Sequence, residues 1–254
     1  WSSDVCSSDL TCHRGTRSPN VMPSIDLLYA SPPDPEPGDP ITQAEGQPTP
    51  DAIIDKFLAA IGGAQRAGGL TSLTATGTYR GFDDAAESPM EIFATAAGQR
   101  TTVVRGPAGV ATWMVDPREG WIAAPPVDRP LPLMQLTGGD LEGAQLEARM
   151  FFPAGIKTAL RNLRTGFPTT INNRSVAVVQ GTTPGGVVAT LSFDRETGLL
   201  VRLTRYNASP IGRIVTRTDY SDYRDVGGVK LPFKWTLSWL NGDRKSTRLN
   251  SSHS

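Results

Sequence analysis

The stretch Val229-Lys-Leu-Pro-Phe-Lys-Trp-Thr-Leu-Ser-Trp239 places a large apolar residue at every second position. A side-chain period of two is typical of a β-strand with one buried and one solvent-facing side. Three aromatic rings, at positions 233, 235 and 239, fall on the buried side and need a broad apolar surface. Pro232 falls on the other side and cannot donate a ladder hydrogen bond, which predicts an edge strand or a bulge at that point.

Short extended runs precede this stretch and predict the rest of a sheet. Turn signals rich in Gly, Pro, Asn and Asp separate five runs, over residues 176–180, 187–193, 199–204, 214–223 and 229–239. Regular spacing of this kind predicts consecutive antiparallel strands. Such a sheet must twist, and with one apolar face it tends to curl around its core. An earlier series of similar runs covers residues 73–79, 90–97, 100–104, 110–115 and 120–124.

A first helix is predicted to begin at Thr49 and Pro50, with Thr as the N-cap and Pro at the first helical position. The apolar residues that follow share one helical face, and Gly62-Gly63 ends the pattern. The helix is either a lid over a site or a packing helix laid on the sheet, and we favour packing.

Residues 138–167 predict two further helices, the second opening at Pro153. Arg161 and Arg164 would lie on a solvent-facing side of the second helix, which we favour, or contact a phosphate or lipid headgroup. These patterns predict an α+β fold class. The sheet would be curved and antiparallel, an open half-barrel covered by a few helices. A Pro-rich linker and an irregular N-terminal tail would precede it.

Both ends of the chain resemble translated sequencing adapter. Residues 1–10 and 243–253 can be read from DNA strings that are reverse complements of each other over their shared length. The alternative, a Ser-rich flexible tail at each end, leaves this complementarity unexplained, and foreign segments are excluded from fold reasoning. We therefore expect a natural fragment of about residues 11–242. The predicted parts are adapter (1–10), a haem-module remnant (11–30), a linker (31–50), a half-barrel (51–242) and adapter (243–254).

The composition limits the classes of partner. The 254 residues carry 25 Lys and Arg against 25 Asp and Glu, so nothing favours nucleic acid or an anionic membrane as a general partner. No apolar run in the sequence is long enough to span a bilayer. A membrane association through a missing N-terminus is left open.

Cys12 and His13 are the residues in this sequence with cofactor chemistry. Covalent haem attachment uses C-x-x-C-H, in which two thiols bind the haem and the adjacent imidazole ligates the iron. The second Cys and the His stand in the right order here, but Asp9 occupies the place of the first Cys, inside the expected adapter. Taken alone, a chance Cys-His dipeptide is the other interpretation. The stretch Ser31–Pro50 then predicts a semi-rigid linker.

The predicted half-barrel lacks the side chains of common catalytic sites. No Cys and no His occurs between residues 51 and 242, and no phosphate-binding glycine motif is present. Asp219, Asp222 and Asp225 recur every three residues, which suits either an ion site or, as we favour, polar turns and strand ends. We therefore expect that the chain is not an enzyme.

Two family resemblances rest on these residues. The motifs Pro50-Asp-Ala-Ile-Ile-Asp-Lys-Phe57, Phe193-Asp-Arg-Glu-Thr-Gly-Leu-Leu-Val201 and the segment Thr218–Trp235 resemble the outer-membrane lipoprotein-sorting (LolA/LolB-like) superfamily. That resemblance implies an open half-barrel closed by helices around an apolar cavity. The order Cys-His-Arg-Gly, proline linker and half-barrel is similar to the photosynthetic reaction centre cytochrome c subunit family. This second resemblance implies haem c on Cys12, with His13 as the iron ligand.

Two functions follow as expectations. The first is a fragment of a c-type cytochrome of the periplasm or cell envelope, which transfers electrons to an unknown redox partner protein and uses the half-barrel for docking. The alternative is a periplasmic carrier or sensor of the lipoprotein-sorting type, which binds a lipid or lipoprotein. A purely structural domain is the third and weakest interpretation.

Overall fold

The structure is a computed structural model that describes residues 38–81, 86–125, 131–209, 212–238 and 244–253. The chain divides into two units, residues 1–36 and 37–254, and all described residues belong to the second. The predicted haem-module remnant lies outside the described residues.

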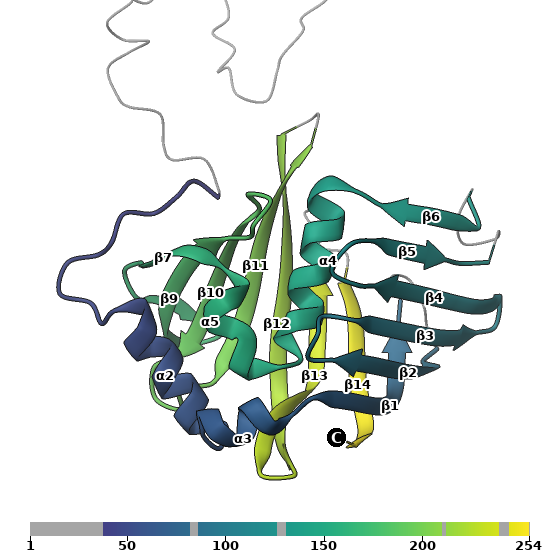
Figure 1. The fold of residues 1–254 in the computed structure, drawn as a ribbon, viewed down its shortest axis with the longest axis horizontal. Helices are drawn as coiled ribbons and strands as arrows, with labels where there is room; N and C mark the ends of the chain where they lie inside the picture. The colour runs from purple at the N-terminus through teal and green to yellow at the C-terminus, as the bar shows by residue number, and fades with distance from the viewer. Residues whose placement is uncertain (1–37, 82–85, 126–130, 210–211, 239–243, 254) are drawn as a thin grey trace, which may run out of the picture. The chain divides into compact units, whose positions relative to one another are not determined.

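The second unit is built on one antiparallel sheet (Figure 1). Its strands in the first half of the chain are β1 (Ser72–Arg80), β2 (Ser88–Thr95), β3 (Arg100–Gly106), β4 (Gly109–Val115), β5 (Gly120–Ala123) and β6 (Leu133–Leu136). The second half adds β7 (Arg161–Thr165), β8 (Thr169–Ile171), β9 (Arg174–Thr182), β10 (Val188–Asp194), β11 (Leu200–Ser209), β12 (Gly212–Val226), β13 (Val229–Ser238) and β14 (Arg244–His253). The order is β6-β5-β4-β3-β2-β1-β14-β13-β12-β11-β10-β9-β7, with β8 paired to β9. Because β6 and β7 do not pair with each other, the sheet is open, as the predicted half-barrel requires.

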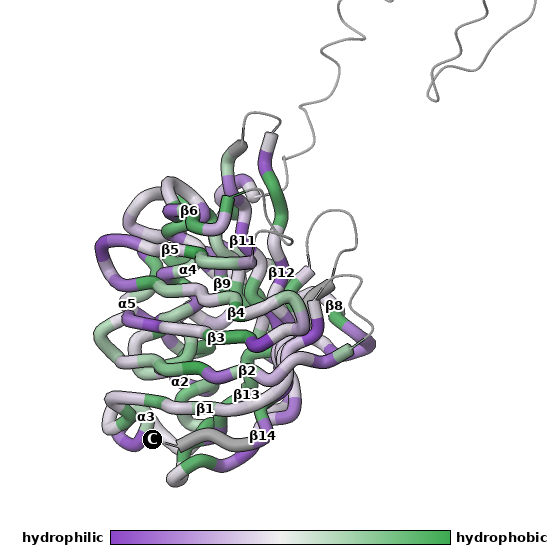
Figure 2. Tube along the Cα trace, turned by 90° about the vertical axis from the view of Figure 1, so that its right-hand side faces the viewer, coloured by the Kyte–Doolittle hydropathy of each residue, from purple (hydrophilic) through white to green (hydrophobic). Residues whose placement is uncertain are grey.

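The helices of this part of the chain lie against the curved sheet. They are α2 (Pro50–Ala60), α3 (Ala64–Gly69), α4 (Gly138–Met150), the 3-10 turn η1 (Pro153–Gly155) and α5 (Ile156–Ala159). Figure 2 shows β1 to β6 stacked as one wall of the sheet. Figure 1 shows α4 running between that wall and the strands of the second half. The sequence therefore predicted the fold class correctly.

Strand β13 confirms the alternation from which the sheet was predicted. Val229, Leu231 and Phe233 are buried, while Lys230 and Lys234 are exposed. The strand is not at an edge, because it lies between β12 and β14, and its register with β12 is continuous. Pro232 is tolerated because β14 pairs only with positions 234–238, so the proline removes no hydrogen bond from that ladder.

Strand β14 is formed by the segment that the sequence analysis assigns to adapter. It pairs with β1 on one side and β13 on the other. Pairing of this kind uses backbone N–H and C=O groups, which any strand-forming sequence supplies to an unpaired edge. The presence of β14 therefore does not test where the segment comes from, and the adapter interpretation stays a prediction.

Helix α2 packs on the sheet by one face, as the sequence interpretation of a packing helix predicted. Ile53, Ile54, Phe57 and Leu58 are buried. The Phe57 ring lies 5.4 Å from the ring of Phe193 on β10, measured between centroids. Fully burying each such side chain contributes about 1.5–3 kcal/mol, so this face supplies most of the helix's stability.

Thr49 caps the first turn of α2, and its loss is expected to weaken the fold modestly. The Ala52 backbone N–H donates to the Thr49 hydroxyl oxygen at 3.2 Å. Thr49→Ala leaves that donor without its cap and should lower the free energy of unfolding by about 1 kcal/mol in urea titrations. Thr49→Ser keeps the capping oxygen and should be nearly neutral; equal losses in both variants would contradict the capping role.

The second predicted helix in residues 138–167 is wrong in its length. Its helical part stops at Ala159, and Arg161–Thr165 form β7 instead. Leu160 has extended backbone, with φ −125° and ψ 150°, which ends the helix, and β7 gains a ladder with β9. Arg161 and Arg164 are exposed, and the Arg164 guanidinium donates to the Ile41 carbonyl at 3.0 Å. Strand β6 was not predicted, because prolines at positions 130 and 132 suggested a break.

Residues 38–49, assigned to the linker from their sequence, lie along β7 and β9. The Ile41 N–H donates to the Gln180 side-chain oxygen at 2.8 Å. The Thr165 hydroxyl donates to the Pro48 carbonyl at 2.8 Å, and Ala44 N–H donates to the Thr165 carbonyl at 2.8 Å. These bonds fix the path of the chain into α2.

Candidate ligand-binding cavity

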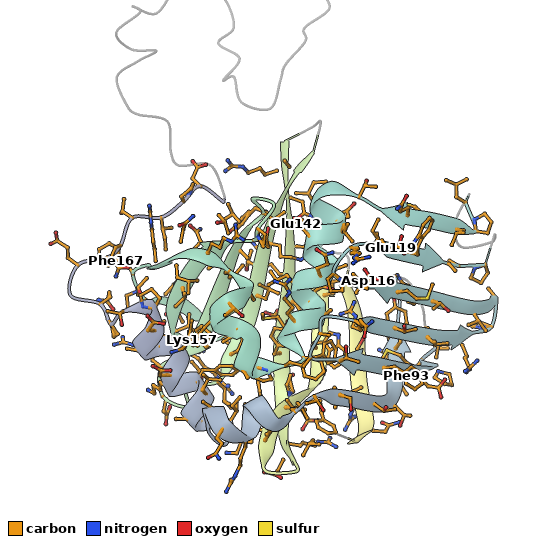
Figure 3. All side chains as sticks on the ribbon, in the orientation of Figure 1. Phe93, Asp116, Glu119, Glu142, Lys157 and Phe167 are labelled. Atoms are coloured by element: carbon orange, nitrogen blue, oxygen red, sulfur yellow. The ribbon has the colours of Figure 1, made fainter. Side chains whose placement is uncertain are left out.

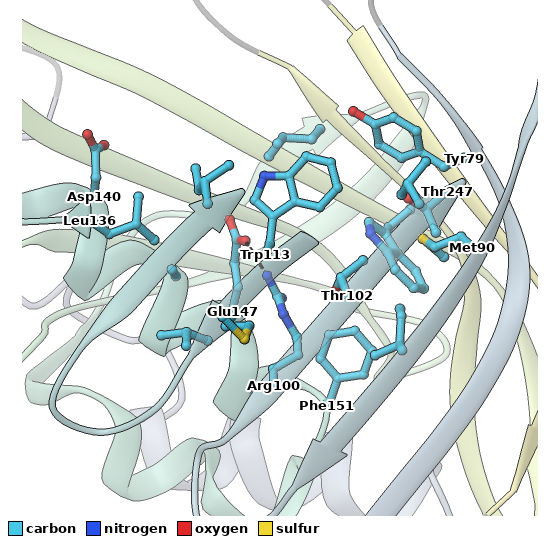
Figure 4. Close-up of a pocket in the computed structure, with 18 of the residues that line it drawn as sticks. Tyr79, Met90, Arg100, Thr102, Trp113, Leu136, Asp140, Glu147, Phe151 and Thr247 are labelled. Carbon is cyan, nitrogen blue, oxygen red and sulfur yellow. Dashed lines mark ion pairs between the residues drawn. The ribbon is translucent and has the colours of Figure 1, made fainter. Parts of the chain in front are cut away.

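A cavity of about 340 Å³ lies between the inward face of the sheet and α4. This volume falls at the lower end of the range for small-molecule sites, about 300–1,000 Å³. Figure 4 shows this cavity in close-up. Its lining is mostly apolar and comprises Tyr79, Met90, Ile92, Arg100, Thr102, Val104, Trp113, Met114, Val115, Ile122, Met134, Leu136, Asp140, Ala144, Glu147, Phe151, Arg205, Trp235, Leu237 and Thr247.

Strand parity explains why these side chains line the cavity. Ile92 pairs with Thr102, and Thr102 pairs with Trp113, so one row of inward side chains crosses three strands. Trp113 packs against Tyr79, with 6.0 Å between ring centroids. These two rings come from β1 and β4 and meet across β2 and β3, where they form part of one apolar wall.

The opposite wall joins α4 to β13. The Phe151 ring, which follows α4, meets the Trp235 ring edge to face at 5.6 Å. A smaller annex of about 70 Å³ continues past these rings and is lined by Leu73, Arg100, Glu147, Met150, Phe151, Thr218, Tyr220, Leu231, Pro232, Trp235, Leu237 and Leu249. Five residues line both spaces, Arg100, Glu147, Phe151, Trp235 and Leu237, so we treat them as one site.

Helix α4 is fixed to both halves of the sheet. The Gln145 side chain donates to the Asp116 carbonyl, in the turn between β4 and β5, at 3.0 Å. The Glu142 carboxylate accepts from the Gly185 N–H, in the turn between β9 and β10, at 3.1 Å. Figure 3 labels Asp116, Glu119 and Glu142 around this helix. The helix therefore closes one side of the cavity without filling it.

A charged cluster lies inside this largely apolar site. The Glu147 carboxylate on α4 accepts from the Arg205 guanidinium on β11 at 2.7 Å. It also forms a 3.7 Å ion pair with Arg100 on β3, drawn in Figure 4. The side chains of Arg100, Arg205 and Glu147 are 15%, 10% and 19% exposed, so water screens these charges weakly.

Tyr220 lines the annex beside this cluster. Burial raises the pKa of its phenol well above the ordinary value, and the negative charge of Glu147 raises it further. The phenol therefore stays protonated and neutral at physiological pH, as a hydrogen-bond donor next to the charged groups.

The recurring aspartates do not form an ion site in the described residues. Asp219 pairs with Arg202, Asp222 pairs with Arg224, and the Asp225 carboxylate accepts from the Gly228 N–H at 2.9 Å. Within those residues, no group of three or more His, Cys, Asp and Glu side chains could hold a metal ion. The favoured interpretation of these residues as polar turns and strand ends agrees with their partners.

Comparison with known proteins gives the fold and not the identity. No family model matches the chain, and no curated protein matches it. A LolA superfamily protein from Nitrosomonas europaea matches with a TM-score of 0.53 and 14% identity, over 82% of this chain and 94% of that one. The fold is similar to that of the LolA superfamily.

Two further solved structures agree with this likeness. A putative outer membrane lipoprotein-sorting protein domain from Vibrio parahaemolyticus matches with a TM-score of 0.50 and 10% identity, over 79% of this chain and 92% of that one. A DUF1329 family protein from Desulfovibrio piger matches with a TM-score of 0.53 and 8% identity, over 80% and 92%. At these identities the likeness to the LolA superfamily shows the fold alone.

The prediction of a haem-binding, electron-transferring c-type cytochrome is corrected by these findings. The part of the chain that the structure describes matches lipoprotein-sorting-like folds, and it contains no metal-binding group. The resemblance to the photosynthetic reaction centre cytochrome c subunit family and the predicted redox partner have no support. Cys12 and His13, predicted to hold haem c and its iron, lie outside the described residues, so their role stays a prediction.

The three residues of the charged cluster, Arg100, Glu147 and Arg205, were not predicted from the sequence. Arg205 shares strand parity with the buried Leu203, and Arg100 shares it with the buried Val104. A charged residue on the buried side of a predicted strand is the signal that could have found both, because burying an unpaired charge is costly.

Among the described residues, the helices are too short or too polar to span a bilayer.

Proposed function

We propose that the chain binds a lipid or the acyl chain of a lipoprotein in this cavity, as a carrier or sensor in the periplasm or cell envelope. The observation that carries the proposal is the apolar cavity of about 340 Å³ between the inward face of the sheet and α4. A filled core would stabilise the fold better, since each unfilled volume forfeits packing contacts. The solved structures with a similar fold include one described as an outer membrane lipoprotein-sorting protein domain, which supports the same proposal.

The function proposed is binding and not catalysis. Glu147 pairs with both cations of the cavity, Arg100 and Arg205, and the cavity lining contains no Cys, His or Ser. The common pairs of nucleophile and base combine a Ser or Cys with a His, and this lining provides none of those side chains. The sequence expectation that the chain is not an enzyme therefore stands as part of the proposal.

Native mass spectrometry of the full chain tests the proposal. After purification under mild conditions, we expect an added mass equal to one lipid or acyl chain, which organic extraction removes. Isothermal titration calorimetry of the extracted chain with 1-dodecanol should then show saturable binding at one site. A chain that carries no lipid and binds no medium-chain amphiphile would contradict the proposed function.

Filling the cavity from α4 is expected to block binding. Ala144 lines the cavity, so the ring of Ala144→Phe would occupy the space of the acyl chain. We expect the affinity for 1-dodecanol to fall about tenfold or more, the equivalent of about 1.4 kcal/mol. Ala154→Phe makes the same change at an exposed position in η1 and should leave the affinity unchanged. Equal affinities in both variants would place the ligand elsewhere.

A further inference from the structure

The charges of the cluster formed by Arg100, Glu147 and Arg205 do not balance among themselves. Arg100 reaches the site from β3 and Arg205 from β11, and both face the single carboxylate of Glu147. Asp140 is the second carboxylate of the cavity lining, but it lies in the first turn of α4, seven residues before Glu147, where it accepts from the Asn207 amide at 3.2 Å. Two guanidinium groups on one carboxylate leave an excess of one positive charge in this cluster.

Both guanidinium groups also have donors to spare. The Nε atoms of Arg100 and Arg205 are buried and have no hydrogen-bond partner among the described residues. The Arg205 side chain is 10% exposed, and Arg100 is held to Glu147 only at 3.7 Å and to the Phe151 ring at 5.7 Å. A buried donor without an acceptor is costly, and an oxyanion beside these guanidinium groups would offset their excess positive charge.

The arrangement of the backbone supports a fixed position for Arg205. Gly143 on α4 has no side chain, and a Cβ atom there would overlap the Arg205 guanidinium. The absence of that atom lets the guanidinium lie directly against the helix and next to Glu147. A guanidinium held in this way keeps a fixed orientation, and planar guanidinium groups are well suited to bind carboxylate and phosphate.

We propose that the ligand of this cavity is an anionic amphiphile whose carboxylate or phosphate head lies at Arg100 and Arg205. Its acyl chain then extends along the apolar wall that includes Trp113, Ile122 and Leu136. This inference rests on the proposed function and adds the chemical class of the ligand. The neutral phenol of Tyr220, which lines the annex with Arg100, supplies a further donor on that side.

A ligand series with one chain length tests the head group. Isothermal titration calorimetry of the full, lipid-extracted chain would compare dodecanoate, dodecyl phosphate, 1-dodecanol and dodecylamine. We expect an anionic head to bind about tenfold or more tighter than the alcohol, because hydrogen bonds to charged groups exceed neutral ones by that margin. The amine should bind more weakly than the alcohol. The tighter of the two anions identifies a carboxylate or a phosphate as the head.

Two substitutions of opposite expected effect keep the test independent of folding defects. Arg100→Gln removes one cation and should bring the affinity for the preferred anion close to that of the alcohol. Glu147→Gln removes the competing carboxylate and should raise the affinity for the anion. Arg105→Gln is the matched control, because Arg105 lies on the same strand but is exposed on the other face and pairs with Glu91. Thermal melts would confirm that each variant is folded.

The outcomes separate this inference from the proposed function. If the alcohol binds as tightly as both anions, the cavity still binds an acyl chain but the assignment of an anionic head is overturned. The same holds if Arg100→Gln leaves the ratio of the two affinities unchanged. If no amphiphile binds at all, both the inference and the proposed function fail.

Discussion

Replacing Phe193 with alanine is expected to lower the free energy of unfolding by about 4 kcal/mol. The side chain is 1% exposed, so almost all of its surface is removed from water in the folded state. Its ring also contacts Phe57 of α2, with 5.4 Å between centroids. Loss of the ring would therefore leave a cavity under α2 as well as removing apolar contacts, and both effects have the same sign.

Urea denaturation followed by circular dichroism would measure this loss. Phe167→Ala is the matched control, because Phe167 is 72% exposed and lies at the outside of the molecule in Figure 3. That variant should stay within about 0.5 kcal/mol of the original chain. A similar loss in both variants would mean that the burial of Phe193 and its contact with Phe57 do not account for the effect.

The strands could be predicted from the sequence because strand periodicity is a local signal. The alternation in 229–239 and the turns before it gave five neighbouring strands in the right order, β9 to β13. The turn at Asp194 shows why this succeeded. The Asp194 carboxylate accepts from the N–H groups of Glu196 and Thr197 at 2.9 Å each, so the residues that mark the turn also build it.

Predictions failed where a distant partner decided the local structure. Ile156 and Leu160 have helical spacing, but the next residues gain a ladder with β9, and the helix stops. Strand β6 forms despite its flanking prolines because β5 offers an edge over four residue pairs. In both segments tertiary pairing outweighed the local pattern.

The charged cluster could not be assembled from the sequence, because its members come from three elements. Arg100 and Arg205 are far apart in the chain, and Glu147 stands between them on a helix. Their inward position on β3 and β11 could be suspected from strand parity. That they meet at one carboxylate depends on the curvature of the sheet and the placement of α4, which no local pattern gives.

Glu147→Ala is expected to destabilise the fold by about 3 kcal/mol, because removing one partner of a buried ion pair leaves the other charge uncompensated. Here two guanidinium groups, of Arg100 and Arg205, would face each other in a poorly solvated site. Glu119→Ala removes an exposed carboxylate and should change stability by less than about 0.5 kcal/mol. Urea titrations of the two variants would give both values.

A double-mutant cycle and a ligand titration would separate lost packing from uncompensated charge. Arg205→Met added to Glu147→Ala should cost less than the sum of the single changes, with a coupling energy of about 1 kcal/mol or more. Additive losses would mean that the carboxylate stabilises the fold by packing alone. Dodecanoate or dodecyl phosphate should stabilise Glu147→Ala more than the original chain, because ligand stabilisation follows affinity and the anion would take the place of the missing carboxylate. The stability lost with Glu147 and the affinity gained for an anion would then have one cause, the excess positive charge of Arg100 and Arg205.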